Sequence, residues 1–128
     1  MNVLLDTCTF IWLVSDPSQV SPRAASLIKN RANQVWISPV NVWEIITKRR
    51  SRKLVLKGKI SRIVREQVRK NALRVLPVRL KHVLANRTLP LIHKDPFDRI
   101  LICQALAAGL TILTPDHQIR QYPVPTEW

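Results

Sequence analysis

Short apolar runs alternate with segments of helical periodicity along this chain. Asn2–Asp6, Gln34–Ile37 and Thr111–Leu113 are apolar runs of strand length, and Arg74–Val78 is a fourth candidate strand. Between them, Lys59–Leu73 repeats its apolar residues every three or four positions, which predicts an amphipathic helix. The pattern therefore alternates strand and helix.

Capping signals mark where several helices begin. Ser21-Pro22 predicts a helix to about Arg31, and Ser38-Pro39 predicts one through about Arg50. Asp95 and Pro96 predict the start of the most apolar helix, and Gly109 fits its end. Weaker signals predict short helices at Thr9–Val14 and Val78–Ala85, a last helical turn opened by Thr114-Pro115, and an edge strand near Val124.

Alternating strands and helices are typical of an α/β fold. We expect a central parallel sheet with helices on both faces, in one domain spanning residues 1–128. The chain has only two glycines, which excludes a glycine-rich phosphate loop and with it the P-loop and dinucleotide-binding folds.

Charge changes this picture from an ordinary α/β domain to one with a polyanionic partner. The chain holds 21 Lys and Arg against 8 Asp and Glu, for a net charge of +13. Such an excess favours nucleic acid first and an anionic membrane surface second. Residues 45–94 hold sixteen of the basic residues and one acid, Glu66.

Part of this basic segment continues directly from the predicted helix that begins at Pro39. We predict that Lys48, Arg49, Arg50 and Arg52 contact phosphates, and the alternative is a solvated surface. The four tryptophans, Trp12, Trp36, Trp43 and Trp128, are expected to pack in the core rather than stack on bases.

The chain shows no sign of export or membrane insertion. Its first residues have no basic region, and no run reaches 18 apolar residues, so neither a secretory signal nor a transmembrane helix is expected. Cys8 and Cys103 lack zinc-ligand spacing to each other or to any histidine. Reduced, buried thiols in a cytoplasmic protein are therefore expected.

Four of the scarce acids are candidates for one site. Asp6 and Asp116 follow predicted strands, Asp98 lies in the first turn of the apolar helix, and Glu44 lies in the helix after the second strand. Ligands of open α/β sheets bind at the carboxyl ends of strands, where these positions converge. Singly, each aspartate also fits an ordinary capping or turn role.

Clustered carboxylates beside a basic surface indicate a particular chemistry. Half-buried carboxylates repel one another unless a cation neutralises them, and an all-oxygen ligand set selects Mg²⁺ or Mn²⁺. Such a metal beside a polyanion-binding surface is typical of phosphodiester hydrolysis.

These residues resemble the motifs of the PIN-domain nucleases, and among them the VapC-like toxins of toxin–antitoxin pairs. "LLDT" places the first family acid on Asp6, "SPVNVWEI" the second on Glu44, "HKDPFDRILICQALAAGL" the third on Asp98, and "LTPDHQI" the fourth on Asp116. Asp95, Thr7 and Thr114 are candidates for accessory roles. One departure is Arg52, which stands where many relatives carry Gly.

The resemblance implies a three-layer α/β/α fold and an endoribonuclease that depends on Mg²⁺ or Mn²⁺. It also implies RNA as substrate, a homodimer, and a cognate antitoxin that neutralises the activity.

Three other functions are compatible with part of the sequence. A phosphatase of the haloacid dehalogenase type would use Asp6 as nucleophile, but Cys8 stands where its second Asp is needed. A non-catalytic nucleic-acid-binding protein explains the charge but not the acids. A metal-dependent DNA nuclease stays open, since recognition of the ribose 2′-OH leaves no short motif.

Overall fold

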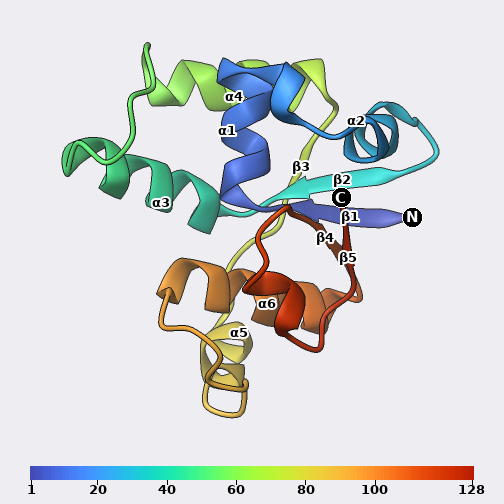
Figure 1. Cartoon of the computed structure of the whole chain (residues 1–128), viewed down its shortest axis with the longest axis vertical. Helices are drawn as coiled ribbons and strands as arrows, with labels where there is room; N and C mark the ends of the chain where they lie inside the picture. The colour runs from blue at the N-terminus through green and yellow to red at the C-terminus, as the bar shows by residue number, and fades with distance from the viewer.

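The computed structural model describes residues 1–128, and its centre is a five-stranded sheet whose strands are all parallel (Figure 1). In the sheet the strands lie in the order β3-β2-β1-β4-β5. β1 pairs Val3 with Val35 of β2 on one side and with Thr111 of β4 on the other. The strands are β1 (Asn2–Leu5), β2 (Gln34–Ile37), β3 (Arg74–Val75), β4 (Thr111–Leu113) and β5 (Thr126–Glu127). The predicted parallel sheet is confirmed.

Six α-helices connect the strands. They are α1 (Thr7–Ser15), α2 (Pro22–Lys29), α3 (Pro39–Arg50), α4 (Ile60–Lys70), α5 (Leu80–Ala85) and α6 (Pro96–Ala108), with 3₁₀ turns at Pro17–Gln19 and Ile119–Gln121. None of the six combines the length and the apolar character that a membrane-spanning helix needs.

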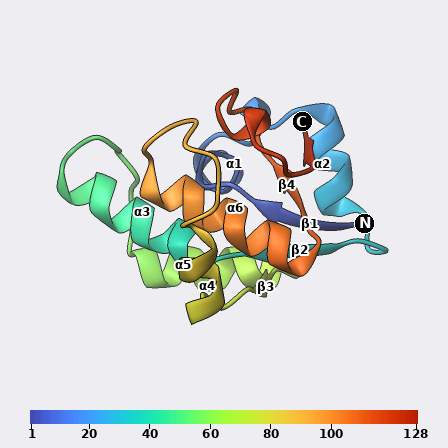
Figure 2. The same ribbon diagram turned by 90° about the horizontal axis from the view of Figure 1, so that it is seen from below.

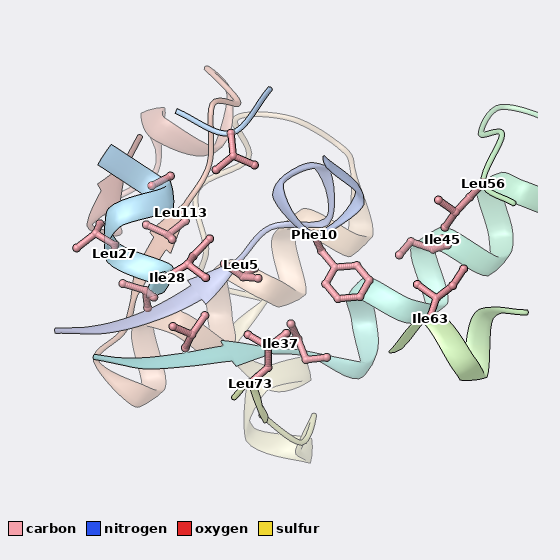
Figure 3. Close-up of a cluster of buried hydrophobic side chains, with 14 residues drawn as sticks. Leu5, Phe10, Leu27, Ile28, Ile37, Ile45, Leu56, Ile63, Leu73 and Leu113 are labelled. Atoms are coloured by element: carbon pink, nitrogen blue, oxygen red, sulfur yellow. The ribbon is translucent and has the colours of Figure 1, made fainter. Parts of the chain in front are cut away.

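Helices pack on both faces of the sheet, with a separate hydrophobic core under each helical layer. The fold therefore has three layers. Val3 and Leu5 of β1 point to one core, which Phe10 of α1 and Ile28 of α2 complete (Figure 3). Leu4 points to the opposite core, to which α6 contributes more residues than any other element (Figure 2). Successive residues of a strand face opposite sides, so a strand covered on both faces must be apolar throughout. The predicted α/β/α architecture is confirmed.

The starts of α2, α3 and α6, where a serine or aspartate cap stands before proline, were predicted correctly. The side chains of Ser21, Ser38 and Asp95 accept hydrogen bonds from the first turns of α2, α3 and α6. The helical turn predicted to open at Thr114-Pro115 was wrong, because the 3₁₀ turn there begins only at Ile119.

One prediction about the core was also wrong. Trp43 is 59% exposed, with its ring edge-to-face against Phe97 at a centroid distance of 4.8 Å. The buried positions of α3 are Val40, Asn41, Glu44 and Ile45. Trp43 lies off that buried stripe of the helix, whereas the polar residues Asn41 and Glu44 lie on it.

Two helices end in a left-handed turn without glycine. After α3, Arg52 has φ +60°, and the amide of Lys53 donates to the carbonyl of Lys48 at 2.9 Å. After α4, Ala72 repeats this geometry with φ +50°. Such helix ends usually carry Gly, since a side chain disfavours the left-handed region. The connection after α3 therefore keeps the shape that glycine would give it, although Arg52 occupies the position.

The order of the strands fixes where a site can form. The chain runs outward from β1 to β2 and β3, then returns to place β4 on the other side of β1. The connections after β1 and β4 therefore leave in opposite directions and open a crevice between their carboxyl ends.

Candidate active site

The crevice at the ends of β1 and β4 is a cleft of about 330 Å³ in which the acids of the chain are concentrated. Five of the eight acidic residues line it: Asp6, Glu44, Asp95, Asp98 and Asp116. The structure thus brings together the four acids singled out in the sequence and the accessory Asp95.

Asp6 lies deepest in the cleft. It follows β1, is 3% exposed, and caps α1 by accepting a hydrogen bond from the amide of Thr9 at 2.7 Å. Its second oxygen accepts a hydrogen bond from the Thr114 hydroxyl. Burial raises the pKa of Asp6 to about 6, with a contribution from the charge of Asp116, although the bonds from Thr114 and Thr9 act in the opposite direction. Asp6 is therefore a carboxylate held in an environment that penalises its charge.

Asp98 stands across the cleft in the first turn of α6. The cap of that helix is Asp95, which accepts from the amides of Phe97 and Asp98 at 2.9 and 3.1 Å. Burial raises the pKa of Asp98 to about 7, and the charges of Asp95, Glu44 and Asp116 raise it further against the hydrogen bond from His93. Neighbouring acids thus repel Asp98 within one cleft.

Glu44 reaches the cleft from α3 and is 4% exposed. One of its oxygens is paired with Lys48, one helical turn on, and the other oxygen is buried without any hydrogen-bond partner. Burial lowers the pKa of Lys48, but the hydrogen bond and charge of Glu44 outweigh it and the pKa is raised. A buried carboxylate oxygen without a partner is costly, and a cation or a metal-bound water would satisfy it.

Thr114 joins the two strand ends that meet at the cleft. Besides donating to Asp6, its hydroxyl accepts from the amide of Asp116 at 2.9 Å. Asp116 in turn accepts from the amide of Gln118 at 2.8 Å. These bonds hold the segment after β4 as a turn, which explains why the helix predicted from Thr114-Pro115 does not form there.

The donor set fits a hard divalent cation, although the side chains are not arranged around one point. No three His, Cys, Asp or Glu side chains are placed together closely enough to hold a metal ion. Lys48, Thr114 and His93 each occupy an oxygen of one acid. The fit rests on the five clustered carboxylates, on the raised pKa values of Asp6 and Asp98, and on the partnerless oxygen of Glu44.

Only part of the predicted phosphate-binding set reaches the cleft. Of the four residues, Lys48 lines it, because it shares the face of α3 with Glu44. Arg49 instead donates to the carbonyl of Gly58 at 2.6 Å. Arg50 lies with Arg49 on a separate surface, and Arg52 forms the exposed turn. That turn brings in Lys53, a lining residue absent from the prediction.

Two other polar residues that bond groups at the cleft were not predicted from the sequence. Asn41 is buried and donates to the carbonyl of Leu5 and the hydroxyl of Thr7, at 3.2 and 3.1 Å, which ties α3 to the end of β1. His93 hydrogen-bonds Asp98 at 3.0 Å, and its only signal was its place in the "HKDPFDR" segment.

Cys103 is buried as expected, but Cys8 is half-buried and lines the cleft. Burial and the nearby charge of Asp6 raise the pKa of the Cys8 thiol to about 11. Cys8 therefore stays a neutral thiol at neutral pH and cannot replace the second carboxylate of a haloacid dehalogenase.

Comparison with known families agrees with this architecture. Residues 3–125 match the PIN domain family, which is nearly the whole chain. Among curated protein sequences, none matches this chain.

Solved structures with a similar fold come from several bacteria. The structure of VapBC2 from Rickettsia felis, bound to a DNA fragment from their promoter, matches with a TM-score of 0.71 at 16% identity over 99% of this chain and 98% of that one. DNA-bound VapBC from Salmonella typhimurium matches at 0.70 and 16% over 99% and 97%. FitAcB from Neisseria gonorrhoeae matches at 0.61 and 21% over 97% and 95%. At these identities the likeness is one of fold.

Proposed function

This chain belongs to the PIN domain family, and we propose that it is a metal-dependent endoribonuclease that acts as the toxin of a toxin–antitoxin pair. The observation that carries the proposal is the concentration of acids in one cleft. Five of only eight acidic residues line the crevice between β1 and β4, in a chain whose net charge is +13. Like charges gathered in one cleft repel one another unless a cation neutralises them.

Asp6, Asp98 and Asp116 would hold Mg²⁺ or Mn²⁺, and Glu44 would bind it or position its water. When bound, the ion would supply charge neutralisation at the scissile phosphate and an activated water. Asp6 is held by Thr9 and Thr114, so its orientation is fixed before any ligand arrives.

RNA is the proposed substrate, and basic residues around the cleft would receive its phosphates. Lys48 and Lys53 line the cleft beside the acids. Arg49 and Arg50 in the last turn of α3, and Arg52 in the turn after it, add positive charge outside the cleft. Phosphate contacts of this kind give affinity without reading the base sequence.

Cleavage of labelled single-stranded RNA and DNA of the same sequence tests the activity. With Mg²⁺ or Mn²⁺ the protein should cut the RNA internally, EDTA should stop it, and Asp98→Asn should reduce the rate by orders of magnitude. Asp16→Asn is the matched control, because it removes one aspartate charge outside the cleft. Cleavage of DNA alone would replace the proposal with a DNA nuclease, and binding without cleavage would leave only a nucleic-acid-binding protein.

The proposed partner is an antitoxin encoded next to the toxin. Support comes from the fold likeness to chains of the VapBC and FitAcB structures and from the net charge of +13, which favours an acidic inhibitor. Expression of this chain should slow bacterial growth, Asp98→Asn should not, and the neighbouring gene product should restore growth. A harmless wild-type chain would contradict the toxin role without contradicting the nuclease.

We also propose a homodimer. α5 exposes Leu80, Val83 and Leu84 at 74%, 50% and 46%, and Leu91 after it is 77% exposed. Exposed apolar side chains in such number favour a covered surface. Sedimentation of the purified chain should give twice the mass of 14.8 kDa, and Leu84→Glu should give the monomer.

A further inference from the structure

A buried chain of hydrogen bonds leads from Arg99 to the cleft. Nη1 of Arg99 donates to the hydroxyl of Tyr122 at 3.1 Å, that hydroxyl lies 2.8 Å from Nδ1 of His93, and Nε2 of His93 lies 3.0 Å from Oδ2 of Asp98. Arg99 and Tyr122 are 7% and 4% exposed, and the His93 side chain is 8% exposed. These residues share one environment from which water is largely excluded.

The arrangement fixes the direction of each hydrogen bond. The Tyr122 oxygen already accepts from two donors, Nη1 of Arg99 and, at 3.2 Å, the backbone amide of His93. Its own hydrogen is therefore left to donate. Nδ1 of His93 at 2.8 Å is a better acceptor than the His93 carbonyl at 3.4 Å. When the imidazole is neutral, its hydrogen must then be on Nε2.

A hydrogen on Nε2 points the donor of His93 at Asp98. This is the only side-chain hydrogen bond that Asp98 makes, and it occupies one of the two carboxylate oxygens. The other end of the chain is equally constrained, because Arg99 is also bound by the carbonyls of Pro90, Asn86 and Leu89 and by the Asn86 side chain. The rings of His93 and Tyr122 cannot turn without breaking several hydrogen bonds.

We propose that His93 is a positioning residue, which Tyr122 and Arg99 hold as the Nε2–H tautomer so that it presents one oxygen of Asp98 to the cleft. The inference rests on the proposed function of Asp98 as a metal ligand. Partners of this kind, one shell beyond a metal ligand, typically change metal affinity by 10–100-fold when removed.

Three substitutions separate positioning from folding. His93→Ala removes the donor and Tyr122→Phe removes the hydroxyl that sets the tautomer. His93→Gln restores a donor, since its amide nitrogen reaches about as far as Nε2. His82→Ala is the control, because His82 is also buried, 3% exposed, but its Nδ1 accepts from the Arg79 amide at the start of α5 and it bonds none of the cleft acids.

The readout is the Kd for Mn²⁺, measured by calorimetry on folded variants without RNA. We expect His93→Ala to weaken binding by roughly 10–100-fold, Tyr122→Phe to weaken it less, and His93→Gln to recover most of it. His82→Ala should lower the Tm and leave the Kd unchanged. If wild type binds Mn²⁺ and His93→Ala binds equally tightly, the positioning role is wrong. If wild type binds no Mn²⁺, the proposed function and this inference both fail.

The tautomer gives a second readout, which is measured on the wild-type protein. Long-range ¹H–¹⁵N spectra of histidine-labelled wild type should show His93 protonated at Nε2 alone, with the signal assigned by its loss in His93→Gln. Protonation at Nδ1 would overturn the proposed hydrogen-bond directions.

Discussion

Asp98→Asn should stabilise the metal-free protein, although it removes a charge from the first turn of a helix. The Asp98 side chain is 13% exposed, and burial with the charges of Asp95, Glu44 and Asp116 raises its pKa from 3.8 to about 7. Because the folded state holds the Asp98 proton more tightly than the unfolded state does, the contribution of Asp98 to the free energy of unfolding falls as pH rises from about 4 to 7 and then levels off. The neutral amide of Asn escapes this loss.

The size of the gain follows from competing terms. At about 1.4 kcal/mol per pKa unit, the rise from 3.8 to about 7 gives an upper bound of about 4 kcal/mol above pH 7. Loss of the favourable helix-dipole interaction subtracts roughly 0.3–1 kcal/mol, and a net charge above +13 subtracts more. The Asn oxygen can still accept from His93. We therefore expect a gain of about 2 kcal/mol at pH 8 and almost none at pH 4.

Urea denaturation in EDTA at pH 4 and pH 8 measures both values. Asp16→Asn should stay within about 0.5 kcal/mol of wild type at either pH, as an aspartate outside the cleft. Added Mn²⁺ should then stabilise wild type and leave Asp98→Asn nearly unchanged. An Asp98→Asn protein that is less stable than wild type at pH 8 in EDTA would refute the reasoning and make Asp98 an ordinary helix-terminus residue.

Two further predictions concern the connection after α3. Lys53→Ala should lower the slope of the logarithm of the RNA-binding constant against the logarithm of salt concentration by roughly one. Arg69→Ala on α4, the control, should leave cleavage unchanged. Equal cleavage rates and slopes for the two variants would remove Lys53 from the substrate path. Arg52→Gly should raise the free energy of unfolding by about 1 kcal/mol, because a side chain disfavours the backbone conformation at φ +60°. Ala72→Gly should do the same at φ +50°. A loss of stability in both variants would contradict backbone strain at these two positions.

Local signals predicted the elements well where one residue acts through the backbone. Ser38 and Asp95 cap their helices before proline, and such caps depend only on neighbours in the chain. The runs Gln34–Ile37 and Thr111–Leu113 form β2 and β4 with the predicted bounds. In β2 one face is buried and the other, with Gln34 and Trp36, is only partly buried.

Long-range bonds explain what the sequence could not predict. Thr114 is held by Asp6, which is 108 positions away, so the turn after β4 follows from tertiary structure rather than from Pro115. The burial of Asn41 and the exposure of Trp43 likewise depend on Asn41 binding the end of β1. Local propensity does not contain such contacts.

The candidate site was only partly predictable for the same reason. The four acids could be found because acids are scarce in this chain and follow predicted strands or begin helices. The role of His93 depends on Tyr122, 29 positions further on, and no spacing rule joins the two. The turn at Arg52 brings Lys53 rather than Arg49 to the cleft, which a run of basic letters cannot reveal.

The central claim is that the clustered acids hold a divalent metal ion, and anomalous scattering from a crystal soaked in Mn²⁺ tests it most directly. The account predicts an anomalous peak inside the cleft, bound by carboxylate oxygens of Asp6, Asp98 and Asp116, and no such peak in Asp98→Asn. A cleft without a peak in wild-type crystals, at Mn²⁺ concentrations that label other sites, would contradict it.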